Sequence, residues 1–521
     1  MKNSVRHVLA ALFVLGLTDA VCAINLTANR DLSGGAVLTG TPDNVTAQIG
    51  GTTTNYYWWA DKNGDGNAND PVNAGLNLAA FNLTRISDNV GFVLNLHDGT
   101  SPGAVTWGGV SGGELKTRHQ LNDATRGLIA ITNATDVGLW QINTCSGKSG
   151  SRGGAITISQ TGNLVATNLY AYGENDGAGI GGGGAITCTG SGPAGGSLLV
   201  AGQIANYGKP TGASTLGPGP ITISGYSGVT VGSGGIVSYR SANQGSMPAL
   251  TITNIGAGGV TILGPLSHYE TDGDNHAASP APDVTISTAG SVQLIGIDTY
   301  ISYSPGNWLK NHGPGNIIIT AGGSVLAAGD FRTYLNSGGT EWKNAGAVTI
   351  TAGGAVQLAG IDTHNSYNST AYYAGDVQVT AGGDIALKGT VNLSAPSGGD
   401  RRGDLALTAA GSIALNLLDM TNANVVALDS GTGLNQITNA LTNFSTNWIG
   451  GRGTFRAPYL TTQTRLRLPA TQRIYYAYVP GVLNDYLGGY TYKVADLSGT
   501  AGAGGLLMVK PKAEGALISV R

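Results

Sequence analysis

The sequence predicts an all-β protein, a parallel β-helix (β-solenoid) of about ten coils with an N-terminal cap and a C-terminal β-rich cap. Glycine supplies 85 of the 521 residues and charged residues only 11 %, a composition that leaves few residues suited to long helices. One phrase of alternating apolar residues recurs about every 31 residues through most of the chain. Val, Ile and Thr at a period of two are typical of strands, and short strands at such a spacing indicate stacked coils.

Residues 1–23 indicate a signal peptide. Lys2 and Arg6 give a basic start, residues 8–17 are apolar, and residues 21–23 offer the small side chains that cleavage requires. No later segment has about 18 consecutive apolar residues, so no transmembrane span is expected after cleavage. We therefore expect a secreted protein that is extracellular or on the cell surface.

Residues 24–127 lack a clean period and are expected to form the N-terminal cap. Within them, residues 61–70 place oxygen-bearing side chains at alternate positions before a glycine, as in calcium loops of the EF-hand type. A bound calcium would offset the mutual repulsion of these groups and make the cap rigid. A solvated turn is the alternative. The candidate metal ligands are Asp61, Asn63, Asp65, Asn67 and Asp70.

Residues 128–424 carry the repeats. In one copy Ile317 and Ile319 face one way and Ile318 the other, after which Gly322 and its neighbour bend the chain. Inward Ile, Val and Leu should then form apolar columns along the stack. Each copy begins with an apolar residue, at positions 129, 156, 186, 221, 250, 284, 317, 348, 377 and 405.

The spacing of the copies varies, and nearly all of the variation follows the second strand. Insertions should therefore gather on one edge of the coil, where repeat proteins often bind their partners. A β-propeller is the competing fold, but its blades need about 40–45 residues and four strands each. Residues 425–521 lose the period and contain a Tyr-rich stretch, so we expect a C-terminal β-rich cap that covers the open strand edge.

The repeated phrases resemble those of a known family. ITAGGSV at 319–325, VTAGGDI at 379–385 and AGIDT at 359–363 are similar to the filamentous-haemagglutinin-like repeats of secreted bacterial proteins. The resemblance covers about half of the chain. It implies a right-handed parallel β-helix displayed outside the cell, often as an adhesin or a surface fibre.

Alignment of the copies brings aromatic side chains together beside the variable edge. Aromatic rings near carboxylates suit sugar binding, because a ring stacks on the apolar face of a sugar. The alternative is that the stacked rings only stabilise adjacent strands. The candidate ligand-binding edge comprises Tyr172, Tyr239, His268, Tyr300, Tyr334 and His364, with Trp308 and Trp342 in the loops beyond.

Asp298 and Asp362 occupy the same position in two copies, two coils apart, which corresponds to roughly 9.6 Å along the stack. That separation is near the upper limit for the carboxylate pair of an inverting glycosidase, so these residues are weak catalytic candidates. The alternative is that the recurring Asp-Thr pair caps a turn. The basic-plus-acidic cluster of a polysaccharide lyase or hydrolase is not evident, which favours a non-enzymatic protein over an enzyme.

Two cysteines remain after signal cleavage, Cys145 and Cys188. Export would permit a disulfide between them, with two free thiols as the alternative. The net charge is −3 and no basic patch is present, so no nucleic-acid partner is expected. The sequence favours a structural or adhesin-like surface protein that binds a surface glycan or protein through its loop edge. A carbohydrate-binding or polysaccharide-degrading β-helix is the alternative.

Overall fold

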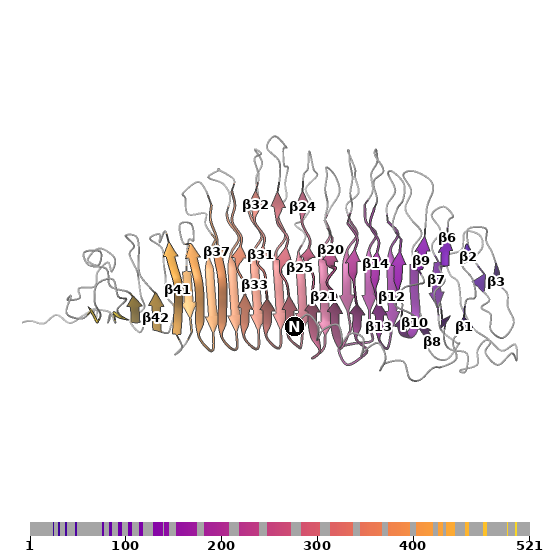
Figure 1. Cartoon of the computed structure of the whole chain (residues 1–521), viewed down its shortest axis with the longest axis horizontal. Coiled ribbons are helices and arrows are strands. Elements are labelled where there is room, and N and C mark those ends of the chain that lie inside the picture. The colour runs from indigo at the N-terminus through magenta and orange to yellow at the C-terminus, as the bar shows by residue number, and fades with distance from the viewer. Residues whose placement is uncertain are drawn as a thin grey trace, which may run out of the picture.

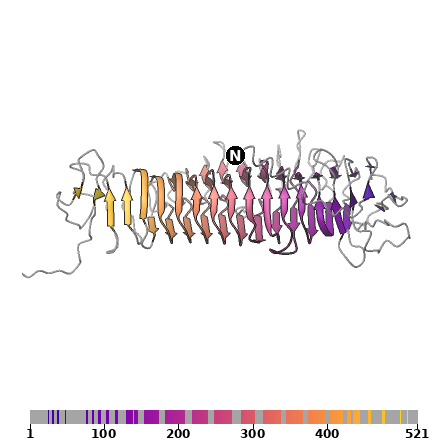
Figure 2. The ribbon, with the colours of Figure 1, turned by 60° about the horizontal axis from the view of Figure 1, so that its bottom comes forward.

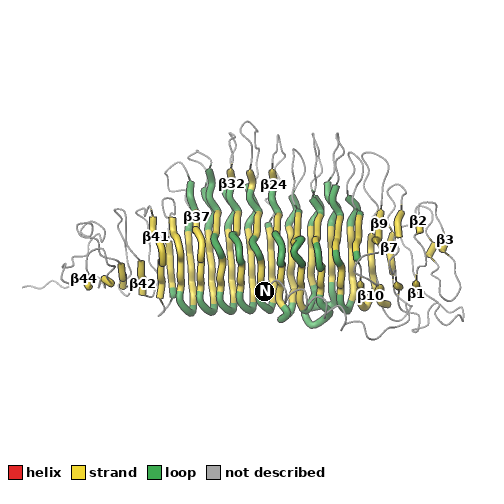
Figure 3. Tube along the Cα trace, viewed as in Figure 1, coloured by secondary structure: helices red, strands yellow, loops and turns green. Residues whose placement is uncertain are grey.

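The computed structural model has only strands, turns and loops in the part of the chain that it describes (Figure 3). Among these residues no helix is long and apolar enough to cross a membrane. The described ranges are 129–138, 140–144, 153–173, 182–207, 218–238, 247–271, 283–302, 313–336, 344–366, 373–395, 403–419, 426–430 and 434–442, with short strands between 24 and 117 and between 454 and 507.

The chain winds into a parallel β-solenoid, which confirms the predicted fold class (Figure 1). In most coils one strand lies in each of three parallel sheets, and each strand pairs with its counterpart one coil later. Sheet one consists of β12 (Ile156–Gln160), β15 (Ile186–Thr189), β18 (Ile221–Ser224), β21 (Leu250–Ile255), β25 (Val284–Thr288), β29 (Ile317–Ala321), β33 (Val348–Ala352), β36 (Val377–Ala381), β38 (Leu405–Ala409) and β40 (Val426–Asp429).

The other two sheets follow the same order. Sheet two consists of β13 (Leu164–Ala166), β16 (Leu198–Val200), β19 (Gly228–Val231), β22 (Gly259–Ile262), β26 (Val292–Leu294), β30 (Val325–Ala327) and β34 (Val356–Leu358). Sheet three consists of β11 (Gln141–Asn143), β14 (Asn168–Tyr170), β17 (Gln203–Ala205), β20 (Gly235–Val237), β23 (Leu266–Ser267), β27 (Ile297–Asp298), β31 (Phe331–Arg332) and β35 (Ile361–Asp362).

Seven successive coils have three separate strands, from β12–β13–β14 to β33–β34–β35, which is fewer than the ten predicted. In the next two coils one strand runs through both sheet two and sheet three: β37 (Ile385–Asn392) and β39 (Ile413–Asp419). In the preceding coil β10 (Ile129–Gly138) likewise pairs in sheets one and two. The predicted start positions are nevertheless all in register, because each pairs with the next from Ile129 to Leu405.

Parallel pairing also continues beyond residues 128–424. At the N-terminal side β7 (Phe92–Asn95) and β8 (Gly103–Thr106) pair with β10, and β9 (Glu114–Thr117) pairs with β11. At the other side β41 (Leu434–Thr442), β42 (Thr454–Ala457) and β43 (Arg473–Tyr476) follow in parallel, whereas β44 (Leu497–Ser498) and β45 (Leu506–Leu507) pair antiparallel. The signal peptide predicted at 1–23 lies outside the described residues.

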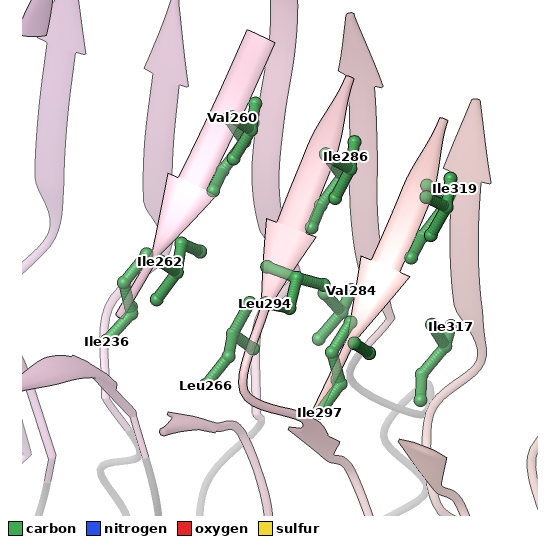
Figure 4. Close-up of a cluster of buried hydrophobic side chains, with 14 of the residues drawn as sticks. Ile236, Val260, Ile262, Leu266, Val284, Ile286, Leu294, Ile297, Ile317 and Ile319 are labelled. Carbon is green, nitrogen blue, oxygen red and sulfur yellow. The ribbon is translucent and has the colours of Figure 1, made fainter. Parts of the chain in front are cut away.

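The core is a set of apolar columns that run along the stack (Figure 4). Val284 and Ile286 of sheet one face Leu294 of sheet two and Ile297 of sheet three, and each is at most 2 % exposed. Along β25 buried residues alternate with partly exposed ones, which is the period-two pattern of the sequence. Gly259, at the start of β22, has a φ of 75°, a left-handed conformation that side chains other than glycine rarely adopt.

Candidate binding edge

The corner after sheet three is where the insertions leave the coil, and buried threonines close the base of four of them. Thr299, 0 % exposed, donates a hydrogen bond through Oγ1 to the carbonyl oxygen of Gly315 at 2.8 Å, on the far side of the insertion. Thr363 makes the same bond to Gly375 at 2.7 Å, and the amide of Gly375 donates back to the carbonyl oxygen of Thr363. We call these residues the corner threonines: Thr144, Thr299, Thr333 and Thr363.

The corner threonines explain why Asp-Thr recurs there. The threonine side chain points into the coil, where its hydroxyl satisfies a carbonyl group that would otherwise be buried without a partner. The aspartate that precedes it faces out. One short motif therefore fixes both ends of an insertion and leaves its length free to vary.

A column of stacked aromatic rings lies outside this corner, one residue beyond the buried position. Tyr300 stacks on Tyr269 with ring centroids 4.9 Å apart and on Tyr334 at 4.7 Å, and Tyr334 stacks on His364 at 4.8 Å. Tyr172 and Tyr207 repeat the arrangement at 4.8 Å, with ring planes 1° apart. We call these residues the aromatic ladder: Tyr172, Tyr207, Tyr269, Tyr300, Tyr334 and His364.

Stacking determines what the aromatic ladder can offer a ligand. The faces of Tyr300 are covered by its two neighbours, so ring edges and hydroxyl groups are the parts left for a partner. Burial raises the pKa of Tyr300 to about 12, and the neighbouring Tyr269, Tyr334 and Asp298 add to the shift while Arg332 opposes it. The hydroxyl therefore stays protonated at neutral pH and can donate a hydrogen bond.

A row of charges runs beside the aromatic ladder on the same outward face. Asp298, Arg332 and Asp362 pair in register on β27, β31 and β35. Arg332 lies 3.6 Å from Asp298 and 3.3 Å from Asp330, and Nδ1 of His364 lies 2.6 Å from Asp362. Burial raises the pKa of Asp298, Arg332 lowers it and Asp330 raises it.

The row of charges includes the two weak catalytic candidates, Asp298 and Asp362, and shows what lies between them. A basic side chain missed by the sequence analysis, Arg332, stands between Asp298 and Asp362. Burial lowers the pKa of Arg332, but the charges of Asp298 and Asp330 outweigh it and the net shift is upward, so the side chain stays cationic. The arrangement is an ion-paired ladder, in which neighbouring coils attract one another, rather than two carboxylates that face each other across open space.

The structure places the predicted edge residues as follows. Tyr172, Tyr300, Tyr334 and His364 belong to the aromatic ladder, and Tyr207 and Tyr269 are members that the sequence analysis missed. Both tyrosines directly follow a polar residue that points into the core, and this pattern in the sequence could have revealed them. Tyr239, Trp308 and Trp342 lie outside the described residues, as do the candidate calcium ligands Asp61, Asn63, Asp65, Asn67 and Asp70.

His268 does not lie at the outward edge, where the sequence predicted it. It points into the core at the position of the corner threonines and is 1 % exposed, while Tyr269 takes the outward place. Burial lowers the pKa of His268 to about 4, and the carbonyl groups of Pro248 and Ser238 oppose this shift. Neither ring nitrogen has a hydrogen bond of ordinary geometry, so His268 does not belong to a solvent-facing edge.

Cys188 lies in the core between Ile158 and Ile223 of sheet one and is a free thiol. Burial raises its pKa to about 12. The disulfide considered for it is therefore absent from this structure, and Cys145 lies outside the described residues. Across the described ranges no group of three or more His, Cys, Asp or Glu side chains could hold a metal ion.

The fold and the edge define a class, that of repeat proteins built as parallel β-solenoids with a stacked aromatic corner. Comparisons of the chain with protein-family models, with curated proteins and with solved structures found no match.

Proposed function

We propose that the chain is a secreted structural protein of the cell surface, filamentous-haemagglutinin-like and adhesin-like, which binds a surface partner through its loop edge. The observation that carries this proposal is the repeated closure of insertions at one corner by the corner threonines. Insertions of different length leave the coil at the same corner in successive coils. A rod that holds many loops in a line can bind at several points at once, which raises avidity without a strong single site.

The ladders beside the loop edge support a structural role. Stacked aromatic pairs contribute about 0.5–1.5 kcal/mol each beyond their buried area, and the row of Asp298, Arg332 and Asp362 adds attraction between coils. Neither feature needs a ligand in order to stabilise the rod. Both are spread over successive coils, which is the distribution expected of a scaffold.

A carbohydrate-binding or polysaccharide-degrading function is the second candidate. The observation that favours it is the position of Arg332, Asp298 and Asp362 beside the tyrosine hydroxyls, a set of groups that can bind sugar hydroxyls. The covered ring faces argue against sugar stacking within the ladder. Recognition of a glycan here would therefore rest on hydrogen bonds.

The test is a binding assay of the purified mature chain on arrays of surface glycans and of surface proteins, with and without calcium. A loop variant has residues 303–312, 337–343 and 367–372 replaced by Gly-Ser segments of equal length. A matched control carries Gln293→Ala and Gln357→Ala on sheet two. We expect binding by the wild type and by the control, and loss in the loop variant.

The same glycans are assayed for new reducing or unsaturated ends, which separates the two candidates. Arg332→Gln is compared with Lys388→Gln, since Lys388 is an exposed cation away from the aromatic ladder. Cleavage that Arg332→Gln abolishes and Lys388→Gln preserves would favour the enzyme. Binding that survives loop replacement, or no binding on either array, would contradict the adhesive edge.

A further inference from the structure

The outward face of sheet one is a regular array of hydroxyl-bearing side chains. The second and fourth residues of its nine strands from β12 to β38 face outward, and none of these eighteen side chains is buried. Fifteen are Thr or Ser, and the exceptions are Ile318, Gln378 and Ala406. We call this surface the threonine face. Its residues pair in register from coil to coil, as Thr187 does with Thr222 and Thr222 with Thr251.

Strand propensity alone does not explain the threonine face. Thr is favoured in strands of any sheet, and stacked Thr pairs stabilise any parallel ladder modestly. Sheet two is formed by strands of the same coils, with the same spacing between neighbouring strands. At the outward middle position of its nine strands from β13 to β39, however, Thr occurs only as Thr230 and Thr261, among Val, Leu, Gln and Ala. The enrichment is specific to one face.

The chemistry of the threonine face excludes most partners. It has no charged residue, so it offers nothing to a phosphate backbone or an acidic surface. It has none of the Trp, Tyr or Arg side chains that anchor protein interfaces, and no aromatic platform for a sugar. Ile318 is its one large apolar side chain, too little for insertion into a membrane. A neutral array of hydroxyl and methyl groups in register fits ordered water.

The spacing of the coils along the array agrees with ordered water as the partner. Coils repeat about every 4.8 Å along the stack. In a tetrahedral water lattice with hydrogen-bonded oxygens about 2.75 Å apart, oxygens that share a neighbour are about 4.5 Å apart. The mismatch is about 0.3 Å per coil, so over four coils it adds up to about 0.9 Å, a fifth of the lattice spacing. The strands of each sheet lie side by side along the rod (Figure 2).

We propose that the threonine face binds the surface of ice. Hydroxyl groups held at fixed spacing keep water near lattice positions, which lowers the entropy lost on adsorption. The methyl groups fill the spaces between lattice oxygens. This surface lies on a different sheet from the aromatic ladder, so the inference stands independently of the loop edge.

The test measures partition of the full mature chain into a slowly growing ice front and its effect on grain growth in a frozen sucrose solution. The face variant is Thr222→Lys with Thr251→Lys. The matched control is Thr230→Lys with Thr261→Lys, which makes the same changes in the same two coils but on sheet two. A second face variant, Thr320→Lys with Thr351→Lys, repeats the test in other coils. Thermal unfolding of every variant reports whether the coils stay folded.

We expect the wild type to enter ice several-fold more than an inert globular protein of similar size, and to slow grain growth. Both face variants should fall to the level of the inert protein, and the control should match the wild type. Exclusion of the wild type from ice would overturn the proposal. Equal losses in the face variants and the control would also overturn it.

Discussion

The buried His268 makes one coil sensitive to acid, and His268→Thr should remove that sensitivity. The histidine occupies the position at which neighbouring coils carry Ser238 and Thr299, and all three side chains are at most 1 % exposed. Threonine is smaller, so the variant leaves a cavity with a cost that does not depend on pH. The difference between pH values therefore isolates the histidine.

The magnitude follows from the depressed pKa. Burial lowers the pKa of His268 from 6.5 to about 4, so between these values the unfolded coil binds a proton that the folded coil does not. The free energy of opening of this coil is highest above pH 6.5 and falls as the pH drops toward 4. One pKa unit corresponds to about 1.36 kcal/mol. The free energy of opening therefore falls by about 2 kcal/mol at pH 5 and by about 3 kcal/mol once the pH is below 4.

The assay is native-state hydrogen exchange, because repeat proteins open locally and a single unfolding free energy is not defined for the whole rod. The amide of His268 donates to the carbonyl oxygen of Asp298, so its protection reports opening of this coil. We expect the free energy of opening for residues 266–269 to fall by about 2 kcal/mol from pH 7 to pH 5. Residues 203–207, with Asn206 at the same position, serve as the control segment.

An equal pH dependence in the wild type and in His268→Thr would contradict this account of His268. A pH-independent wild type would do the same, since it would mean that the ring is neither desolvated nor shut off from protons. Asp298 also has a raised pKa, but it is present in both proteins and cancels in the comparison.

Three further predictions concern the corner, the core and the cap. Thr363→Val should lower protection of the amide of Gly375 by about 1–3 kcal/mol, because the buried carbonyl group of Gly375 loses its hydroxyl partner. Unchanged exchange there would mean that the bond does not hold the loop base. Cys188 should resist thiol reagents at pH 8 until the protein unfolds, because it is buried with a pKa of about 12. Rapid labelling of the native protein would contradict this. If residues 61–70 bind calcium, added calcium should raise the unfolding temperature of the wild type and have no effect on Asp61→Asn with Asp65→Asn. The same rise in both would place the ion elsewhere.

The position of His268 shows where prediction from the sequence failed. A strand alternates its sides at every residue, so an alignment error of one position moves a side chain from solvent to core. Tyr300 was placed correctly because the copy around it is regular. In the next copy, which has one residue more before the corner, the alignment fell on Thr333 and Tyr334 was identified only as its neighbour. The copy around His268 required an assumed insertion, and His268 was aligned in place of Tyr269. Arg332 was missed because its partners, Asp298 and Asp362, are more than 29 residues away in the sequence.

The coil could be predicted from the sequence alone. Its period, its alternation and its paired glycines specify short parallel strands in a stack, because these are local patterns that each copy repeats. Which side chains meet between neighbouring coils became visible only in the folded stack. It showed that the corner threonines bond across the insertions, that the rings of the aromatic ladder cover one another, and that one sheet presents a neutral threonine face. Those properties arise between coils, where residues about 30 positions apart become neighbours at about 4.8 Å.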